Sequence, residues 1–314
     1  MTEPLGFVYL VRDLMRAAGV RCAITSGMAC VYYGLQQTTK DTDWIVDPAD
    51  LAKLRDLLFA QQRRLPPWQI SYRTIFGAPM DARWMQHGWT CHIRLQNEAH
   101  AAEHHLDFFA RPPRVAAWSQ TEDGFAERNV VAMMKKTDRE RDWPFVDSLG
   151  WQMLSAGSDN FLGLLHVQDA ERVRYLWTRA SATERETAAA RRPLLRRIDT
   201  EPTSDRLERW IRLERLVWQC VNRERYGRYQ QAWKDFYRRW RQEADWSWPT
   251  AEPFMSQHQR LLDAASRHGL VMNPLADLDS ARLREAGIEK AAAVSFASVE
   301  QVRSVAPGPT EVLL

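Results

Sequence analysis

The sequence has 314 residues, four cysteines and a formal net charge of +3, and this length allows about two domains. No run approaches the roughly 18 consecutive apolar residues of a membrane span, so we expect no membrane partner. The cysteines form no CxxC pair and the first residues carry no basic-then-apolar signal, which argues against a disulfide framework and favours a cytoplasmic location.

The first part of the chain alternates between helical and extended patterns. Strands are predicted at residues 21–25, 42–46, 68–76, 88–95 and 104–110, and helices at 7–18, 28–35 and 48–61. This order of elements predicts an α/β (α+β) domain over residues 1–115, in which helices flank a small mixed sheet.

Helical patterns dominate the rest of the chain. Helices are predicted at residues 122–136, 142–154, 159–180, 204–245 (as one or two helices) and 249–268. The polar segment 182–197 is interpreted as helix-prone and mobile, and much of the stretch 291–314 as a tail. We therefore expect a helical domain over residues 116–250, followed by C-terminal helices and a tail over 251–314.

Ser26 and Gly27 form a turn of small residues between the first predicted strand and the helix after it. Such a turn lets a phosphate approach the backbone, and the free N–H groups at the start of a helix attract an anion. Glycine-containing turns between strands and helices are common, so the turn indicates a phosphate site only in combination with other residues.

Asp41 and Asp43 lie one residue apart in the second predicted strand. Side chains alternate in a strand, so both carboxylates point to the same face. Because like charges on one face repel, a divalent cation between them is the favoured interpretation, and carboxylate oxygens are ligands that Mg²⁺ prefers. The alternative is that each acid only ends a strand or caps a helix.

Asp107 is a lone acid in the apolar strand pattern His-His-Leu-Asp-Phe-Phe. A third carboxylate from a neighbouring strand would complete a two-metal site, in which two ions about 4 Å apart serve an in-line displacement. The sequence therefore predicts that Asp41, Asp43 and Asp107 bind Mg²⁺ (or Mn²⁺) and carry the catalysis.

Residues 24–29 (ITSGMA), followed by Thr39-x-Asp41-x-Asp43, resemble the nucleotidyltransferase superfamily that shares the DNA polymerase β-like fold. The similarity is greatest to the abortive-infection toxins of bacterial toxin–antitoxin pairs and to the small antibiotic nucleotidyltransferases. It spans roughly residues 20–150. The sequence departs from the pattern at two positions, because Ser26 stands where the first glycine is usual and Gln37 replaces an arginine.

The resemblance implies the transfer of a nucleoside monophosphate from an NTP substrate to an acceptor hydroxyl, with release of pyrophosphate. It implies that Ser26, Gly27 and Thr39 bind the nucleotide, the first two at its β and γ phosphates. Asp107 would also act as the general base on the acceptor. A toxin of this class would have a cognate antitoxin as its partner.

A second stretch of similarity is Lys135-Lys136-Thr137-Asp138-Arg139-Glu140-Arg141-Asp142. By the resemblance, Lys135 or Lys136 contacts the triphosphate together with Arg139, and Asp142 orients the basic side chains. The first helices of the second domain would then complete the nucleotide site. The alternative is a charged junction between helices that local ion pairs hold together.

Several histidines precede Asp107. His100 and His104 have the spacing of metal ligands on a helix, but His104 falls more naturally in the strand of Asp107. Alternation then puts His105 and Asp107 on one face and His104 on the other. A zinc site is therefore disfavoured, and His105 is expected to tune Asp107 or to touch the substrate.

The region from residue 171 to residue 241 is basic, with nineteen Lys and Arg against ten Asp and Glu. Aromatic residues, including four tryptophans at partly helical spacing, are interleaved with the arginines. Packing in a helical core is the first explanation for these rings. The competing one is an RNA surface, where rings stack on bases and arginines hold phosphates.

These patterns favour a nucleotidyltransferase, with RNA (including tRNA) slightly preferred over a small molecule or a protein side chain as the acceptor. A degenerate member that binds nucleotide or RNA without turnover is the main alternative, because of Ser26 and Gln37. A regulatory protein whose helical half recruits a partner is the third.

Overall fold

The computed structural model describes residues 3–64, 68–97, 102–155, 160–244 and 246–312. The described chain divides into two compact units that are not contiguous in sequence. The first unit comprises residues 1–112, 119–126 and 228–274, and the second comprises 113–118, 127–227 and 275–314. The sequence, by contrast, predicts consecutive domains.

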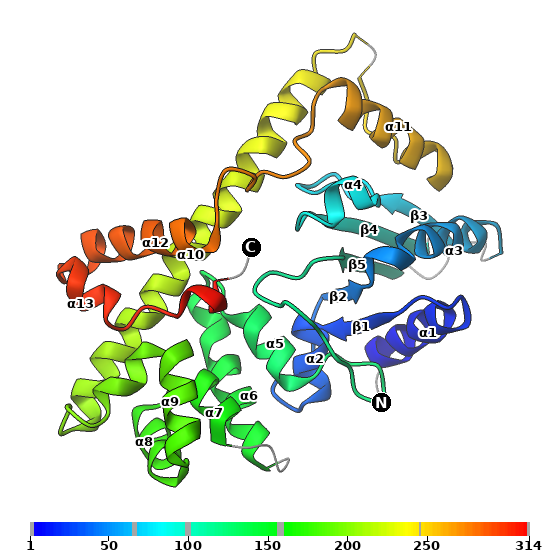
Figure 1. Ribbon diagram of the computed structural model, residues 1–314. Helices are drawn as coiled ribbons and strands as arrows, with labels where there is room; N and C mark the ends of the chain where they lie inside the picture. Colours follow the sequence, from blue (N-terminus) through cyan, green and yellow to red (C-terminus); the bar gives the residue numbers. More distant parts are fainter. Residues whose placement is uncertain (1–2, 65–67, 98–101, 156–159, 245, 313–314) are drawn as a thin grey trace. The chain divides into compact units, whose positions relative to one another are not determined.

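A five-stranded mixed sheet organises the first unit (Figure 1). Its strands are β1 (Cys22–Thr25), β2 (Asp41–Val46), β3 (Trp68–Tyr72), β4 (Thr90–Asn97) and β5 (Ala102–Phe109), in the order β1-β2-β5-β4-β3. The pair β2 and β5 is parallel, and the other pairs are antiparallel. The predicted mixed sheet with flanking helices is confirmed.

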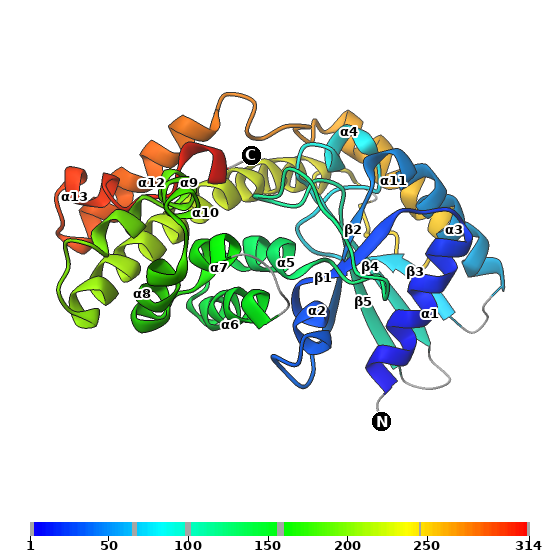
Figure 2. The same ribbon diagram turned by 60° about the horizontal axis from the view of Figure 1, so that its bottom comes forward.

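The helices of the first unit are α1 (Glu3–Ala17), α2 (Ser26–Tyr32), η1 (Pro48–Asp50), α3 (Leu51–Arg64), α4 (Ala82–Met85) and α11 (Phe254–Arg267). Figure 2 shows α1 and α3 along one side of the sheet. Leu14, Leu58 and Leu106 meet there, one from each element. Alternate strand positions on this face carry apolar side chains, and Trp44 and Phe108 among them are completely buried. The opposite face carries the polar side chains.

Residues 119–126 belong to the first unit and are not helical. The prediction of a helix over 122–136 is therefore wrong in its first part, since α5 begins only at Arg128. Phe125 instead bridges Ile24 of β1 and stacks on Tyr32 at a centroid distance of 4.0 Å. Burial of this ring overrides the local helical pattern.

The second unit is helical, which confirms the predicted mainly helical C-terminal part. Its elements are α5 (Arg128–Lys135), η3 (Glu140–Asp142), α6 (Trp143–Ser155), α7 (Asn160–His166), α8 (Ala170–Arg179), α9 (Ala182–Arg191), η4 (Pro193–Arg197), α12 (Ser280–Ser295), α13 (Val299–Arg303) and η5 (Pro309–Glu311). A long helix, α10 (Ser204–Trp240), contributes residues up to 227 to this unit and residues from 228 to the first. No helix among the described residues combines the length and apolar character that crossing a bilayer requires.

Capping groups explain two differences from the predicted helices. The single helix expected over 159–180 is interrupted, because Asp169 accepts a hydrogen bond from the Arg172 backbone N–H and starts α8. The segment expected to be mobile forms α9, which begins with a capping box between Ser181 and Glu184.

The C-terminal segment is not a tail. Val302, Ala306 and Val312 are completely buried in one hydrophobic cluster with Trp218 of α10 and Ile288 of α12. Small apolar residues fit between closely packed helices, so a composition that resembles a loose tail is compatible with a core position. The expectation for residues 291–314 is therefore wrong.

Candidate active site

The three predicted acids lie on the polar face of the sheet. Asp41 and Asp43 are on β2, and Asp43 pairs in register with Asp107 of the parallel neighbour β5. Thr25, the last residue of β1, pairs with Asp43 from the other side. Register and alternation thus bring the acids from two adjacent strands to the end of β1, where the Ser26 turn begins.

Arg73 draws two of these carboxylates together. It follows β3 directly, and its Nη1 lies 3.4 Å from Asp107 Oδ1 and 3.8 Å from Asp41 Oδ1. The Asp107 side chain is 14% exposed and that of Asp41 is 48% exposed. Because one guanidinium nitrogen lies within ion-pair distance of both acids, their carboxylates converge on a common point.

Two histidines contact the same carboxylates. His92 of β4 is the register partner of Asp107, and its Nδ1 lies 2.7 Å from Asp107 Oδ1. His105 Nδ1 lies 2.9 Å from Asp41 Oδ1, and its Nε2 lies 2.6 Å from Glu103 Oε1. His105 therefore neighbours the acids, but it contacts Asp41, whereas His92 is the histidine bound to Asp107.

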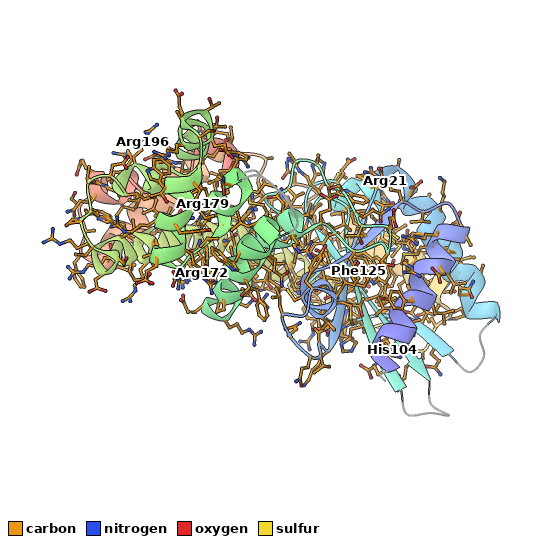
Figure 3. All side chains as sticks on the ribbon, turned by 90° about the horizontal axis from the view of Figure 1, so that it is seen from below. Arg21, His104, Phe125, Arg172, Arg179 and Arg196 are labelled. Atoms are coloured by element: carbon orange, nitrogen blue, oxygen red, sulfur yellow. The ribbon has the colours of Figure 1, made fainter. Side chains whose placement is uncertain are left out.

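His104 points to the other face of the sheet, as alternation predicts. Its ring stacks on Phe7 of α1 with a centroid distance of 3.6 Å, and Figure 3 shows His104 beside that helix. Burial lowers the pKa of His104, and neighbouring His105 lowers it further. The proposed zinc partner His100 lies outside the described residues.

The turn at Ser26 and Gly27 has a strained and crowded backbone. Ser26 has a φ of 52°, in the left-handed region that favours glycine. At Gly27, a Cβ would lie 2.6 Å from Thr39 Oγ1, so only glycine fits there without a shift. Gln36 Nε2 donates to Gly27 O at 2.7 Å. Residues just before β2 thus fix the turn close to the acids.

Lys135, Arg139 and Asp142 form one cluster in the second unit. The Asp142 side chain is 4% exposed and lies 3.4 Å from Lys135 Nζ. It also accepts hydrogen bonds from Thr137 Oγ1 at 2.6 Å and from Arg139 Nε at 2.8 Å. Asp142 therefore orients both cations, while their contact with a nucleotide stays a prediction.

Lys136 is directed into the interior of the second unit. Its Nζ donates to Leu165 O at 3.0 Å and lies 5.2 Å from the ring centroid of Trp218. Burial lowers the pKa of Lys136 from 10.5 to about 8. Of the two lysines that the sequence leaves open, this one is the less accessible to a phosphate.

The residues that resemble the nucleotidyltransferase site lie in different units. The acids, Ser26, Gly27 and Thr39 belong to the first unit, and the Lys135–Asp142 cluster belongs to the second. The structure therefore defines the contacts within each group, because each group lies inside one unit. Their joint action on one nucleotide is a proposal.

Carboxylate chemistry fits the predicted metal ion. Asp41 and Asp107 already direct oxygens toward a single positive charge, and Asp43 stands beside Asp107 on the same face. In the part of the chain that the structure describes, no group of three or more His, Cys, Asp or Glu side chains is arranged to hold a metal as it stands. An ion would therefore replace Arg73 at the carboxylates.

Arg73 is the residue of the site that sequence reasoning missed. The sequence predictions assign no role to His92 either. The segment Gly-Trp-Thr-Cys-His-Ile-Arg-Leu contains a signal, because alternation puts His92 on a face opposite buried Cys91 and Ile93. Arg73 has no such signal, since it lies just beyond its strand and only the fold brings it to Asp107.

The basic character of the second unit is distributed over its helices. Arg172, Arg179 and Arg196, which Figure 3 labels, belong to this unit. Several are engaged locally, for example Arg172 with Asp147 at 2.8 Å and Arg179 with the Tyr175 ring at 5.4 Å. The region therefore contains both paired and outward-facing charge.

Comparisons of this chain with protein-family models, with curated proteins and with solved structures find no match. The geometry of the site and the sequence resemblance therefore carry the functional argument.

Proposed function

We propose that this chain is a metal-dependent nucleotidyltransferase that moves a nucleoside monophosphate from an NTP to an acceptor hydroxyl and releases pyrophosphate. The observation that carries the proposal is the convergence of Asp41 and Asp107 on one nitrogen of Arg73, with Asp43 in register beside Asp107. Three acids from two adjacent strands on one polar sheet face are an unusual arrangement for a purely structural role.

Asp41, Asp43 and Asp107 would hold Mg²⁺ or Mn²⁺. When bound, such ions neutralise the departing pyrophosphate and activate the attacking oxygen. Arg73 keeps the carboxylates together in its present position and would swing away on loading. Its length and its 21% exposed side chain leave it a path toward solvent.

Asp107 is suited to accept the proton of the acceptor hydroxyl. Its Oδ1 is held by His92 at 2.7 Å, which fixes the carboxylate orientation and leaves Oδ2 for other partners. His92 would therefore act as a positioning residue. The proton would pass from the hydroxyl to Asp107 while the hydroxyl oxygen forms its bond to the α phosphorus and the bond to pyrophosphate breaks.

The nucleotide would lie against the Ser26 turn. The positive φ of Ser26 places a small residue in the left-handed region at the start of α2, where backbone N–H groups could meet phosphate oxygens. Thr39 packs against Gly27 and thereby ties the turn to the strand of the acids. Within the second unit Asp142 orients Lys135 and Arg139, and by the resemblance these two cations would neutralise phosphate charge.

The acceptor that we favour is RNA, because the excess of basic residues lies in the helical region. A toxin that modifies RNA would be held inactive by an antitoxin. A small hydroxylated molecule and a protein side chain are the other acceptor classes. Localisation to the cytoplasm follows from the same proposal, since NTPs and RNA occur there.

A degenerate protein that binds nucleotide or RNA without turnover is the second proposal. The specific observation in its favour is that Arg73, His92 and His105 already occupy oxygens of Asp107 and Asp41. The departures at Ser26 and Gln37 point the same way. Such a protein would bind an NTP but would leave its phosphates intact.

One experiment separates the two proposals. The protein is incubated with each α-³²P-labelled NTP, Mg²⁺ and total RNA, and both label transfer and pyrophosphate release are followed. The variant Asp43→Asn removes one acid charge with little change in volume. The matched control is Asp56→Asn, because Asp56 is an acid of the same unit that is 67% exposed on α3 and pairs with neighbouring Arg55.

We expect label transfer by the wild type and by Asp56→Asn, and a loss of at least about 100-fold in Asp43→Asn. Binding of NTP without pyrophosphate release with RNA, a small-molecule mixture or protein as acceptor would refute the enzymatic proposal and support the degenerate one. Equal activity of Asp43→Asn and the wild type would refute the assignment of the acids.

A further inference from the structure

A hollow that is open to solvent lies on the second unit. The first half of α10 and the turn between α12 and α13, two segments that Figure 1 shows, supply its lining residues. Arg206, Arg209 and Arg212 line it at intervals of three residues. On a helix this spacing keeps side chains on neighbouring parts of one face.

The charge of this hollow is positive. Within the described chain neither Arg206 nor Arg209 forms an ion pair, and both are exposed. Arg212 is 3.3 Å from Glu208, but its side chain is 70% exposed. Glu201 is the acid that lines the hollow, and its Oε1 accepts a hydrogen bond from Trp210 Nε1 at 2.7 Å. Unpaired guanidinium groups of this kind suit an anionic ligand.

An aromatic residue lines the hollow among the arginines. Trp210 is half-buried, and Arg197 lies 4.4 Å from its ring centroid. The stacked guanidinium and the hydrogen bond to Glu201 fix the orientation of the indole. Half-buried Leu213 and Leu216 extend the apolar floor beside it. The hollow thus combines a flat apolar surface with a row of cations.

Phe296 lies in the sequence between Ser295 and Ala297, which both line the hollow. It is 97% exposed, although it is the kind of residue that folding normally buries. Its φ is 57°, a left-handed conformation that is strained for a residue with a bulky side chain. The chain therefore presents an aromatic ring to solvent from a backbone conformation that carries an energetic cost, and this combination points to a binding role.

We propose that this hollow binds single-stranded nucleic acid, with a base stacked on exposed Phe296 and phosphates held by Arg206 and Arg209. A single strand exposes base faces next to a continuous row of phosphates, which matches rings beside unpaired arginines. A duplex hides its base faces in the stack and would leave Phe296 without a partner. The proposal deepens the proposed function, on which it rests for the role of the strand as the acceptor.

A protein partner is the other class that an exposed phenylalanine serves. Val294, on the same turn of the chain, is 59% exposed and would enlarge an apolar contact. The observation that favours nucleic acid is the charge, since a hydrophobic protein contact would leave Arg206 and Arg209 without counter-charges. Protein binding is therefore an outcome that the experiment must exclude.

Binding is measured with the full chain, without NTP, by the fluorescence anisotropy of labelled 12-mers of uridine and of thymidine and of a 12-base-pair duplex. The variants are Phe296→Ala and Phe296→Trp. Tyr175→Ala is the matched control, because Tyr175 is a 50% exposed aromatic residue on α8 that does not line the hollow. We expect Phe296→Ala to weaken single-strand binding by about 10-fold or more, and Phe296→Trp to retain it.

A second pair of variants tests the charges. Arg209→Gln should lower the slope of log affinity against log salt by about 0.7, the contribution of one phosphate contact on a single strand. Arg282→Gln is the control, because Arg282 is a 72% exposed arginine on α12 outside the hollow and should leave the slope unchanged. Tighter binding of the uridine 12-mer indicates that the strand is RNA, and tighter binding of the thymidine 12-mer indicates that it is DNA.

Equal affinity of Phe296→Ala and Tyr175→Ala, or equal affinity for duplex and single strand, would overturn the proposal. The proposal would also be overturned if oligonucleotides do not bind and Phe296 is instead needed for association of the chain with itself or with another protein. Asp43→Asn is included because it should bind the 12-mers as the wild type does. If the chain binds oligonucleotides but transfers no nucleotide, the proposed function alone is refuted. If the chain transfers nucleotide, binds no single strand and keeps its full transfer activity in Phe296→Ala, this inference alone is refuted.

Discussion

The buried ammonium group of Lys136 leads to a sharp prediction about stability. Lys136 is 4% exposed, and its ammonium group donates a hydrogen bond to the carbonyl oxygen of Leu165. Folding therefore removes the ammonium charge from water without an equivalent replacement for its hydration. This desolvation lowers the pKa of Lys136 from 10.5 to about 8. Replacing it in Lys136→Met removes the charge and keeps an unbranched side chain of similar length.

The sign of the pH effect follows from proton binding. Between pH 8 and pH 10.5 the unfolded chain holds the lysine proton and the folded chain has lost it, so the stability of the wild type rises with pH. A pKa difference between 10.5 and about 8 corresponds to about 2–3 kcal/mol gained from pH 7 to pH 10. In Lys136→Met this gain is absent.

Urea denaturation at pH 7, 8, 9 and 10 gives the free energy of unfolding of both proteins, and their difference isolates Lys136. The subtraction is needed because burial raises the pKa of Cys22 and of Cys91. The unfolded chain loses those thiol protons first, so these groups lower the stability of both proteins as the pH rises above about 9. Lys290→Met is the control, because Lys290 is 55% exposed and its charge stays in water in both states.

The wild type should gain about 2–3 kcal/mol relative to Lys136→Met between pH 7 and pH 10, and no such trend should separate it from Lys290→Met. A constant difference between the wild type and Lys136→Met over this pH range would refute the buried position of the ammonium group. It would also restore Lys136 as a residue free to reach a phosphate.

Two further predictions concern stability and are measured by the urea midpoint at pH 7. Ser26→Gly should raise the free energy of unfolding by up to about 1 kcal/mol, because glycine relieves the strain of the positive φ. Gly27→Ala should lower the free energy of unfolding by about 1–3 kcal/mol, because the new Cβ meets Thr39. A destabilised Ser26→Gly together with a stabilised Gly27→Ala would contradict the backbone conformation of this turn. Glu214→Ala should cost about 3–5 kcal/mol, since it leaves the 3% exposed guanidinium of Arg192 buried without its carboxylate, and a loss below about 1 kcal/mol would contradict that pair.

Alternation along the strands made much of the candidate site predictable. The prediction that Asp41 and Asp43 share a face holds because successive side chains in β2 alternate between a helix-covered face and a polar one. The same rule separates His104, which stacks on Phe7, from Asp107 on the opposite face. Patterns of period two need no knowledge of the partner strand.

The sequence predicted that Asp107 joins Asp41 and Asp43, but it did not predict which strands pair to bring the side chains of the site together. Asp107 is next to Asp43 because β5 inserts beside β2 in parallel register, and His92 meets Asp107 because β4 pairs with β5 on its other side. The sequence therefore suggested His105 as the neighbour of Asp107, although the register gives that place to His92. Strand order depends on the free energy of the whole sheet, which no local pattern reports.

By itself the sequence determined the classes and most positions of the elements, the shared face of Asp41 and Asp43, and the small turn at Ser26, since these depend on local periodicity and backbone chemistry. Only the tertiary structure decided that Arg73 gathers two carboxylates and that Lys136 is buried against Trp218. It also decided that residues 299–312 pack in a core and that Phe296 is exposed. Burial is a property of the neighbours that the fold assembles, so the same residue types can be core, site or surface until the fold is known.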